Sequence, residues 1–386
     1  MLVKILHILP DEKCIDFAID TFNDVKSSLN TYITIDNIKP FVYIKSHAHD
    51  VQIVNKKDVL SVIIDGGYHM VVFHTLTYDK YELIMQIPKS VKVTWISWGY
   101  DIYFSHSDVP PILSLELYKR LTKEYVKQTQ KISFGKRLKR LLKQFLFFKH
   151  NIEDKKRISK HITTQQCVLN RIDYMSTVLP SEYDALRKNP YFRAEYFPFQ
   201  YIANRSPEIE WVDVKANCIL LGNSATETNN HLDIIKILKK RNISNDCILP
   251  CSYGDENYLH YLENQTNSNN QVHLIKNFMP RDEYKAMLRS CRVGIFGHIR
   301  QQAIGNIILC MLQGNKVFLY KDSVAYQYFS ANGYLVFSID DELSQESIQQ
   351  LLTEAERMHN VTKICKMFSY DVVVKNLEET LNTILE

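Results

Sequence analysis

Short apolar runs alternate with amphipathic stretches along the chain, and the alternation is clearest in the second half. Each apolar run there is followed by residues whose apolar positions recur at helical spacing. Repeated strand–helix units of about 25 to 30 residues are typical of a doubly wound parallel sheet. The runs predicted as strands are Cys218–Leu221, Cys247–Cys251, Val272–Ile275, Val293–Phe296, Val317–Tyr320 and Tyr334–Ser338.

The first half carries similar runs of β-branched and aromatic residues, from Val3–Leu9 to Val91–Ser97. Continuous runs of this kind are typical of buried, mostly parallel strands. A proline-containing stretch at 197–207 predicts a linker between the two halves. We therefore predict an α/β protein with two Rossmann-like doubly wound domains facing across a cleft.

The same patterns predict the domain boundaries. The first domain spans 1–200, the linker 201–215 and the second domain 216–360. A last helix, at 361–386, is expected to pack back toward the first domain. A basic insertion at about 119–160 is assigned to the first domain.

Positive charge is concentrated in this insertion, which holds 15 Lys or Arg residues against three acidic ones. The insertion therefore carries +12, and because the whole chain carries +4, the remainder carries −8. A basic amphipathic helix with aromatic residues on its apolar side is typical of a segment that lies on an anionic membrane surface. A core-packing helix with a basic outer face is the alternative. The residues in question are Lys136, Arg137, Lys139, Arg140 and Lys143, with Phe145 and Phe148 on the apolar side.

Composition narrows the class of protein further. Charged residues make up 23% and hydrophobic residues 45% of the chain, as in folded globular proteins. The eight cysteines form no CxxC pair, which favours free thiols in a reducing compartment such as the cytoplasm. No apolar stretch reaches the roughly 18 residues of a membrane-spanning helix, so we expect a soluble or peripheral protein. No nucleic-acid motif accompanies the basic insertion, and nucleic acid is not expected as a partner.

Polar motifs follow the predicted strands of the second half, where open α/β sheets bind their ligands. Arginine and a helix N-terminus both attract diphosphate oxygens, and a tyrosine ring can stack on a base. An ordinary strand–helix turn and a solvated helix cap are the alternatives. The candidate donor-binding residues are Gly222, Asn223, Ser224, Tyr253, Gly254, Arg300, Gln301, Gln302, Gly305 and Asn306. Because the chain contains no Asp-x-Asp pair, we expect these groups to bind the diphosphate without a metal ion.

Candidate catalytic residues lie in the first half. Asp101 follows a predicted buried strand and stands beside aromatic residues, so it is a candidate general base or sugar ligand. A helix N-cap is the structural alternative for Asp101. His7, His74 and Asp11 also lie at strand ends and are further candidates, although a lone histidine is more often structural than catalytic.

Together these landmarks resemble glycosyltransferase family 56, the TDP-N-acetylfucosamine:lipid II N-acetylfucosaminyltransferases, also called 4-alpha-L-fucosyltransferases. Ala303 stands where the family pattern has glycine, and the basic region is longer than in the family. The residues that carry the resemblance are His7–Leu9, Phe73–His74, Trp98–Tyr103, Leu221–Ser224, Asn230–His231, Tyr253–Gly254 and, most specifically, Arg300–Asn306.

The resemblance implies a GT-B fold. We expect the donor to bind in the second domain and the acceptor in the first. It implies transfer of a deoxy-amino sugar of the N-acetylfucosamine type from a dTDP donor to an undecaprenyl-diphosphate-linked saccharide. It places the enzyme at the cytoplasmic face of the inner membrane, in pathways that build enterobacterial common antigen or O-antigen. A GT-B transferase for another nucleotide sugar, or a non-catalytic subunit that binds nucleotide sugars or glycans, is the alternative.

Overall fold

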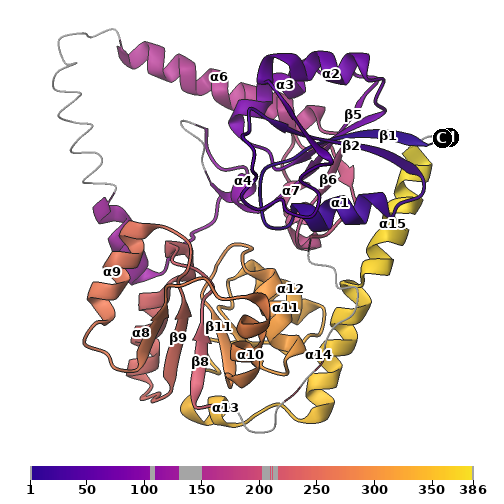
Figure 1. Cartoon of the computed structure of the whole chain (residues 1–386). Helices are drawn as coiled ribbons and strands as arrows, with labels where there is room; N and C mark the ends of the chain where they lie inside the picture. The colour runs from indigo at the N-terminus through magenta and orange to yellow at the C-terminus, as the bar shows by residue number, and fades with distance from the viewer. Residues whose placement is uncertain are drawn as a thin grey trace. The chain divides into compact units, whose positions relative to one another are not determined.

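The computed structural model describes residues 2–104, 109–129, 150–201, 209, 211 and 216–384, with backbone only for 150–158 and without the Arg281 side chain. The described residues divide into two compact units (Figure 1). The first unit is drawn from Met1–Ser114, Lys149–Arg205 and Phe368–Glu386, and the second from Leu115–Phe148 and Ser206–Met367.

The first unit is built on a parallel sheet of seven strands in the order β3-β2-β1-β4-β5-β6-β7. The strand order reverses between β1 and β4, and ligands of doubly wound sheets bind at such a switch point. The strands are β1 (Val3–Ile8), β2 (Ser28–Ile35), β3 (Val51–Val54), β4 (Met70–His74), β5 (Lys92–Ile96), β6 (Tyr174–Ser176) and β7 (Glu195–Tyr196).

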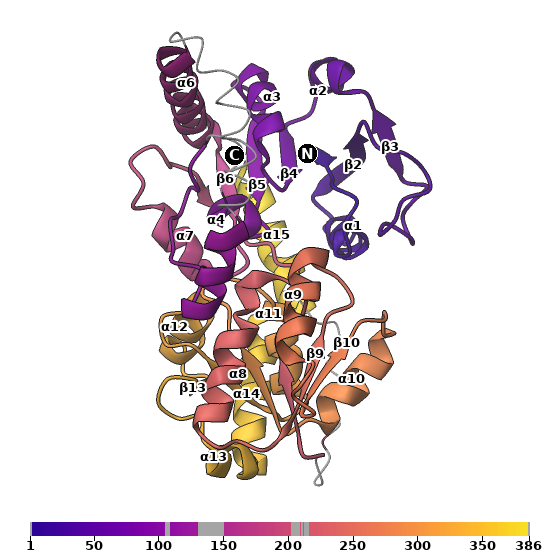
Figure 2. The same cartoon turned by 90° about the vertical axis from the view of Figure 1, so that its left-hand side faces the viewer.

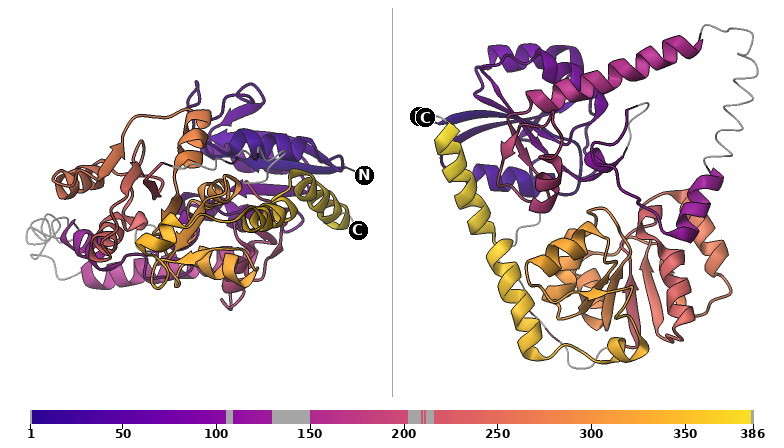
Figure 3. Two further views of the ribbon diagram at one scale, coloured as in Figure 1. Left: turned by 90° about the horizontal axis from the view of Figure 1, so that it is seen from below. Right: turned by 180° about the vertical axis from the view of Figure 1, so that it is seen from behind.

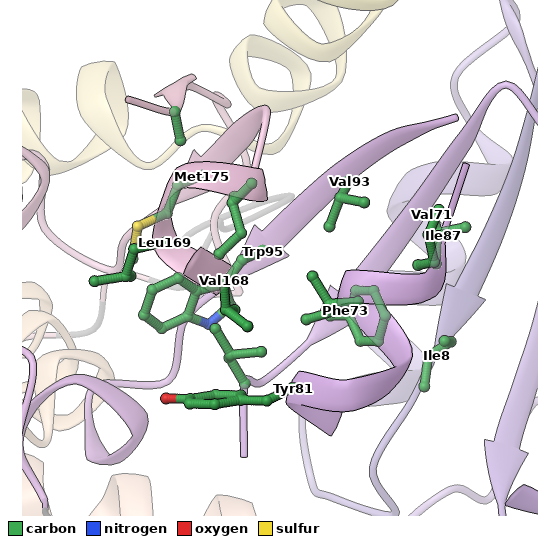
Figure 4. Close-up of a cluster of buried hydrophobic side chains, with 14 of the residues drawn as sticks. Ile8, Val71, Phe73, Tyr81, Ile87, Val93, Trp95, Val168, Leu169 and Met175 are labelled. Atoms are coloured by element: carbon green, nitrogen blue, oxygen red, sulfur yellow. The ribbon is translucent and has the colours of Figure 1, made fainter. Parts of the chain in front are cut away.

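Helices cover both faces of this sheet, which is why its central strands consist mainly of apolar residues that are buried on both faces. On one face, Trp95 of β5 and Met175 of β6 pack with Val168 and Leu169 of α6, as Figure 4 shows. Helices α2, α3 and α6 contribute to this face, and α1 and α15 to the other. The helices are α1 (Ile15–Asn23), η1 (Lys56–Asp58), α2 (Val59–Asp65), η2 (Tyr78–Lys80), α3 (Tyr81–Gln86), α4 (Tyr100–Tyr103), α6 (His150–Arg171), α7 (Pro180–Leu186) and α15 (Tyr370–Ile384).

The second unit repeats this plan with a parallel sheet of six strands in the order β10-β9-β8-β11-β12-β13 (Figure 2). Its strands are β8 (Cys218–Leu221), β9 (Asp246–Pro250), β10 (Val272–Ile275), β11 (Val293–Phe296), β12 (Lys316–Leu319) and β13 (Phe337–Ser338). Its helices are η3 (Glu227–Asn229), α8 (His231–Lys240), α9 (Glu256–Thr266), α10 (Arg281–Ser290), α11 (Ile304–Leu312), α12 (Val324–Ala331), α13 (Gln345–Gln349) and α14 (Glu354–Met367). The prediction of two Rossmann-like doubly wound domains is thus confirmed.

The basic insertion predicted at 119–160 does not belong to one domain. Its first part lies in the second unit, where the backbone N–H of Lys119 donates to Asn230 and that of Thr122 to Asp233. Its last part belongs to α6, which packs in the first unit. The predicted amphipathic helix from Lys136 to Phe148 lies outside the described residues.

The single helix predicted at 361–386 is two helices in the structure. Helix α14 ends at Met367 in the second unit, and α15 begins at Tyr370 in the first (Figure 3). The side chains of Tyr370, Val373 and Leu377 are buried in the core of the first unit. None of the helices among the described residues combines the length and the apolar character that crossing a membrane requires.

Candidate functional site

The loop that follows β8 is held together by Asn229. The Oδ1 atom of Asn229 accepts the backbone N–H of Asn223 at 3.0 Å, and its amide nitrogen donates to the carbonyl oxygen of Ser224 at 3.0 Å. Gly222 has φ +72°, and a Cβ there would lie 2.5 Å from Asn229 Oδ1 and 2.6 Å from His231 Nε2. The packing of the loop itself therefore requires glycine at this position.

Gly254 joins the loop after β9 to the loop after β8. It pairs with Ala225 in an isolated bridge, and a Cβ on Gly254 would collide with the Ala225 backbone. The backbone N–H of Ala225 in turn donates to the carbonyl oxygen of Tyr253 at 2.8 Å. The Tyr253 side chain is 47% exposed, and its hydroxyl accepts the amide of Asn223 at 2.8 Å. A partly exposed tyrosine is thereby fixed at the carboxyl edge of the sheet.

His298 follows β11 and completes this group of side chains, although the sequence analysis did not single it out. Asn223 uses its amide nitrogen on Tyr253, so its Oδ1 accepts from His298 Nε2 at 3.1 Å. Burial, with smaller contributions from Arg300 and His231, lowers the pKa of His298 well below its ordinary value. The neutral ring then presents Nδ1 as an acceptor, and no partner for this atom exists among the described residues. His298 stands next to an apolar strand, so only its place at a strand end marks it in the sequence.

Gln302 fastens two loops together. Its Oε1 accepts the Thr228 hydroxyl at 2.6 Å, and its amide nitrogen donates to Thr226 Oγ1 at 3.3 Å. The loop after β8 is therefore tied to the segment that leads from β11 into α11. In this position Gln302 supports the site and does not present its amide to a ligand.

Arg300 and the start of α11 provide the positive charge of the second unit's site. Arg300 is 9% exposed, and its Nη1 donates to the carbonyl oxygen of Gln301 at 2.7 Å. Helix α11 begins without a side-chain cap, so the N–H groups of its first turn, which includes Gly305 and Asn306, point toward the carboxyl edge of the sheet. Its N-cap residue Ala303 has φ +58°, a left-handed conformation that glycine adopts more easily. This conformation explains the glycine of the family pattern.

Asp101 in the first unit is enclosed by hydrogen-bond donors. It is 2% exposed, and its oxygens accept Trp95 Nε1 at 2.8 Å, Trp98 N at 2.9 Å and Leu76 N at 3.0 Å. Burial raises the pKa of Asp101, and these donors offset part of that rise. The N-cap position of α4 belongs to Gly99, and Asp101 lies in the first turn of this helix. The geometry favours a structural role for Asp101, because a general base has to reach the substrate.

His7 and His74 form a buried chain of hydrogen bonds with fixed direction. Asn30 donates its amide nitrogen to Phe22 and Ser28, so its Oδ1 accepts from His7 Nε2 at 3.1 Å. His7 Nδ1 then accepts from His74 Nε2 at 3.1 Å, and His74 Nδ1 accepts the Tyr201 hydroxyl at 2.6 Å. Both rings are 0% exposed. They support the carboxyl edge of β1 and β4 from within and do not face a ligand.

The two carboxylates after β1, Asp11 and Glu12, differ in their hydrogen bonding within the fold. Asp11 accepts the backbone N–H groups of Tyr43 and Ile44, both at 2.9 Å, and so organises the loop before β3. Glu12 is half-buried, and burial raises its pKa, with the neighbouring Lys13 offsetting part of the rise. No ion pair involves Glu12 in the described part of the chain.

The histidine chain predicts acid sensitivity of the first unit. Burial lowers the pKa of His7 to about 3 and that of His74 well below its ordinary value, whereas both titrate near 6.5 when unfolded. Below pH 6.5 the unfolded chain therefore binds protons that the folded unit does not, and stability falls as pH falls. Each histidine contributes about 1.4 kcal/mol per pH unit. The free energy of unfolding can be measured by urea unfolding followed by tryptophan fluorescence. Between pH 6 and pH 5 this free energy should fall less steeply with pH in His74→Gln than in the wild type, by about 1.4 kcal/mol per pH unit. An equal fall in both proteins would contradict the assignment.

The fold of the chain is similar to that of several solved proteins. A glycosyltransferase from Rickettsia africae ESF-5 gives a TM-score of 0.61 at 12% identity, with 100% of this chain and 99% of that chain covered. The Anabaena protein Alr3699/HepE, solved with UDP and glucose, gives 0.60 at 9% identity, with 99% and 100% covered. Sucrose-phosphate synthase from Thermosynechococcus elongatus gives 0.59 at 9% identity, with 99% of each chain covered. The two Rossmann-like sheets and this likeness define the GT-B fold.

The family model described as 4-alpha-L-fucosyltransferase, glycosyl transferase group 56, matches residues 181–371, about half of the chain. The match spans every predicted donor-binding residue, from Gly222 to Asn306. The protein is thus a glycosyltransferase. The resemblance seen in the sequence is confirmed, and this part of the chain belongs to glycosyltransferase family 56.

Proposed function

We propose that this glycosyltransferase moves a deoxy-amino sugar of the N-acetylfucosamine type from a dTDP donor to a lipid-diphosphate-linked saccharide during surface polysaccharide synthesis. The observation that carries the proposal is the gathering of an exposed tyrosine, an arginine and an uncapped helix start at one sheet edge. These are Tyr253, Arg300 and α11, within the part of the chain that matches the family. The donor sugar and the lipid-linked acceptor follow from the family resemblance.

The donor binds in the second unit. Its diphosphate lies against Arg300 and the first turn of α11, where fixed positive charge stabilises the negative charge that develops on the departing dTDP. Tyr253, held in place by Asn223, stacks on the thymine ring. Arg300 and the helix N-terminus fill the role that a divalent ion has in metal-dependent transferases, so we expect turnover to survive chelation of metals.

The acceptor binds in the first unit, where Glu12 is the proposed general base. A carboxylate whose pKa is raised by partial burial is a stronger base and can still reach a substrate hydroxyl. Glu12 replaces Asp101, His7, His74 and Asp11 in this role, because those four side chains are occupied within the fold. Peripheral attachment to the cytoplasmic face of the inner membrane, through the basic segment that includes Lys136 and Lys143, accompanies a lipid-linked acceptor.

A donor screen tests this function. Purified protein is incubated with a short lipid-diphosphate disaccharide and a panel of nucleotide sugars, with and without EDTA, and release of the nucleoside diphosphate is followed. We expect turnover with a dTDP-linked amino-deoxyhexose, unchanged by EDTA. Turnover with a different donor would show that the transferred sugar is not of the N-acetylfucosamine type. Binding without release for every donor would identify a non-catalytic subunit.

A further inference from the structure

A segment far away in the sequence is fastened to the loop after β8. Asn230, which is 0% exposed and has φ +52°, accepts the backbone N–H of Lys119 on its Oδ1 at 2.7 Å. Its amide nitrogen donates to the carbonyl oxygens of Gly297 at 2.7 Å and Leu117 at 3.2 Å. One buried side chain therefore holds the two peptide groups on either side of Tyr118 and ties them to the end of β11.

A second anchor lies directly beyond the first. Residues 120–129 are helical, and Asp233 of α8 accepts the backbone N–H groups of Leu121 at 2.7 Å and Thr122 at 3.0 Å. These are N–H groups of a first helical turn, which have no partner within their own helix. Tyr125 of the same helical segment stacks on Tyr261 of α9 with ring centroids 4.3 Å apart, and Figure 3 shows the segment beside α9.

The Lys119 side chain adds a third set of contacts directly after Tyr118. Its ammonium group lies 4.3 Å from the centroid of the Tyr320 ring and 2.8 Å from a carboxylate oxygen of Asp322. Backbone and side-chain contacts thus fix the residues before and after Tyr118. Such fixing of a single half-buried position costs conformational entropy and is useful where a side chain has to be presented to a ligand.

Tyr118 itself is half-buried and lies near the charges of the candidate donor site. Burial raises the pKa of Tyr118, Glu227 adds to this rise, and Arg300 opposes it. The phenol therefore stays protonated at neutral pH and is a hydrogen-bond donor. No hydrogen bond or ring contact of Tyr118 occurs within the part of the chain that the structure describes, so its packing does not explain why it is held there.

We propose that Tyr118 is a donor-binding residue whose hydroxyl donates a hydrogen bond to a diphosphate oxygen of the nucleotide sugar beside Arg300, with Asn230 as its positioning residue. The inference rests on the proposed function and deepens it. It places a determinant of donor affinity on a segment that the sequence pattern assigns to the acceptor domain. A hydrogen bond from a neutral donor to an anionic oxygen is strong enough to be measured by a single deletion.

The test measures binding of dTDP, UDP and GDP to the full chain by titration calorimetry. We expect Tyr118→Phe to raise the Kd of the preferred nucleotide on the order of tenfold, with an unchanged thermal midpoint of the free protein. Tyr261→Phe is the matched control, because it removes a phenol hydroxyl from a ring that stacks on Tyr125, and its Kd should equal that of the wild type. A wild-type Kd in Tyr118→Phe, alongside weaker binding by Arg300→Ala, would overturn the role of Tyr118 and leave the donor site in place. If none of the three nucleotides binds, both the role of Tyr118 and the proposed donor site are wrong.

The positioning role of Asn230 has its own readout. Asn230→Ser should weaken nucleotide binding in the wild-type background and have little further effect on binding in the Tyr118→Phe background, because the two act through one hydrogen bond. A residue that only stabilises the fold would lower binding equally in both backgrounds. Equal losses would therefore remove Asn230 from the proposal.

Discussion

Replacing Arg300 with alanine is expected to lower kcat/KM for the sugar donor by about 10² to 10³-fold, the range observed when one preorganised group that stabilises transition-state charge is removed. Arg300 is 9% exposed, at the carboxyl edge of the sheet and next to the uncapped start of α11. Negative charge on the diphosphate grows as the sugar departs, so the loss should appear mainly in kcat.

Arg300→Lys separates charge from geometry in the same experiment. Lysine keeps the positive charge but cannot bind two diphosphate oxygens with one planar group, so we expect an intermediate loss. Lys236→Ala removes an exposed cation from α8 and is the control for net charge. If Arg300→Ala folds normally and retains wild-type kcat/KM, the diphosphate does not bind at this sheet edge.

The two sheets were predictable because helices cover both faces of their central strands. Most residues of these strands are apolar, and the predicted runs Cys218–Leu221 and Val293–Phe296 coincide with β8 and β11. The helix break at Phe368 was not predictable from apolar spacing. Phe368 is itself buried and continues the apolar pattern, while the chain passes there from one unit to the other.

The location of the candidate donor site was predictable from the sequence, but the roles of its individual residues were not. The rule that ligands bind at the carboxyl edge identified Tyr253 and Arg300. It could not show that Gly222 makes room for Asn229 or that Gln302 ties two loops together, because these are contacts between loops. The place of Tyr118 depends on Asn230, more than a hundred positions away, and the local pattern contains no trace of that contact.

Glu12→Gln is expected to lower kcat by about 10² to 10⁴-fold, the usual contribution of a general base, with little change in the KM for the donor. Glutamine keeps the size of the side chain and cannot accept a proton at neutral pH. Burial raises the pKa of Glu12, so the wild-type rate should fall as the pH is lowered through that raised pKa and the carboxylate becomes protonated. The variant should lose this pH dependence.

If Asp101 has a structural role, Asp101→Asn should lower stability and leave kcat unchanged, the opposite of Glu12→Gln. Asparagine would turn an N–H group toward donors such as Trp95 Nε1 and Leu76 N, so we expect the free energy of unfolding to fall by about 3 kcal/mol. The folded molecules should retain a kcat near the wild-type value. This kcat can be measured by dividing the rate by the concentration of folded protein only. A stable Asp101→Asn protein without turnover, together with an active Glu12→Gln, would return the role of general base to Asp101. If only Glu12→Gln loses kcat, the general base is Glu12. The loop after β1 places this partly exposed carboxylate at the switch point of the first sheet.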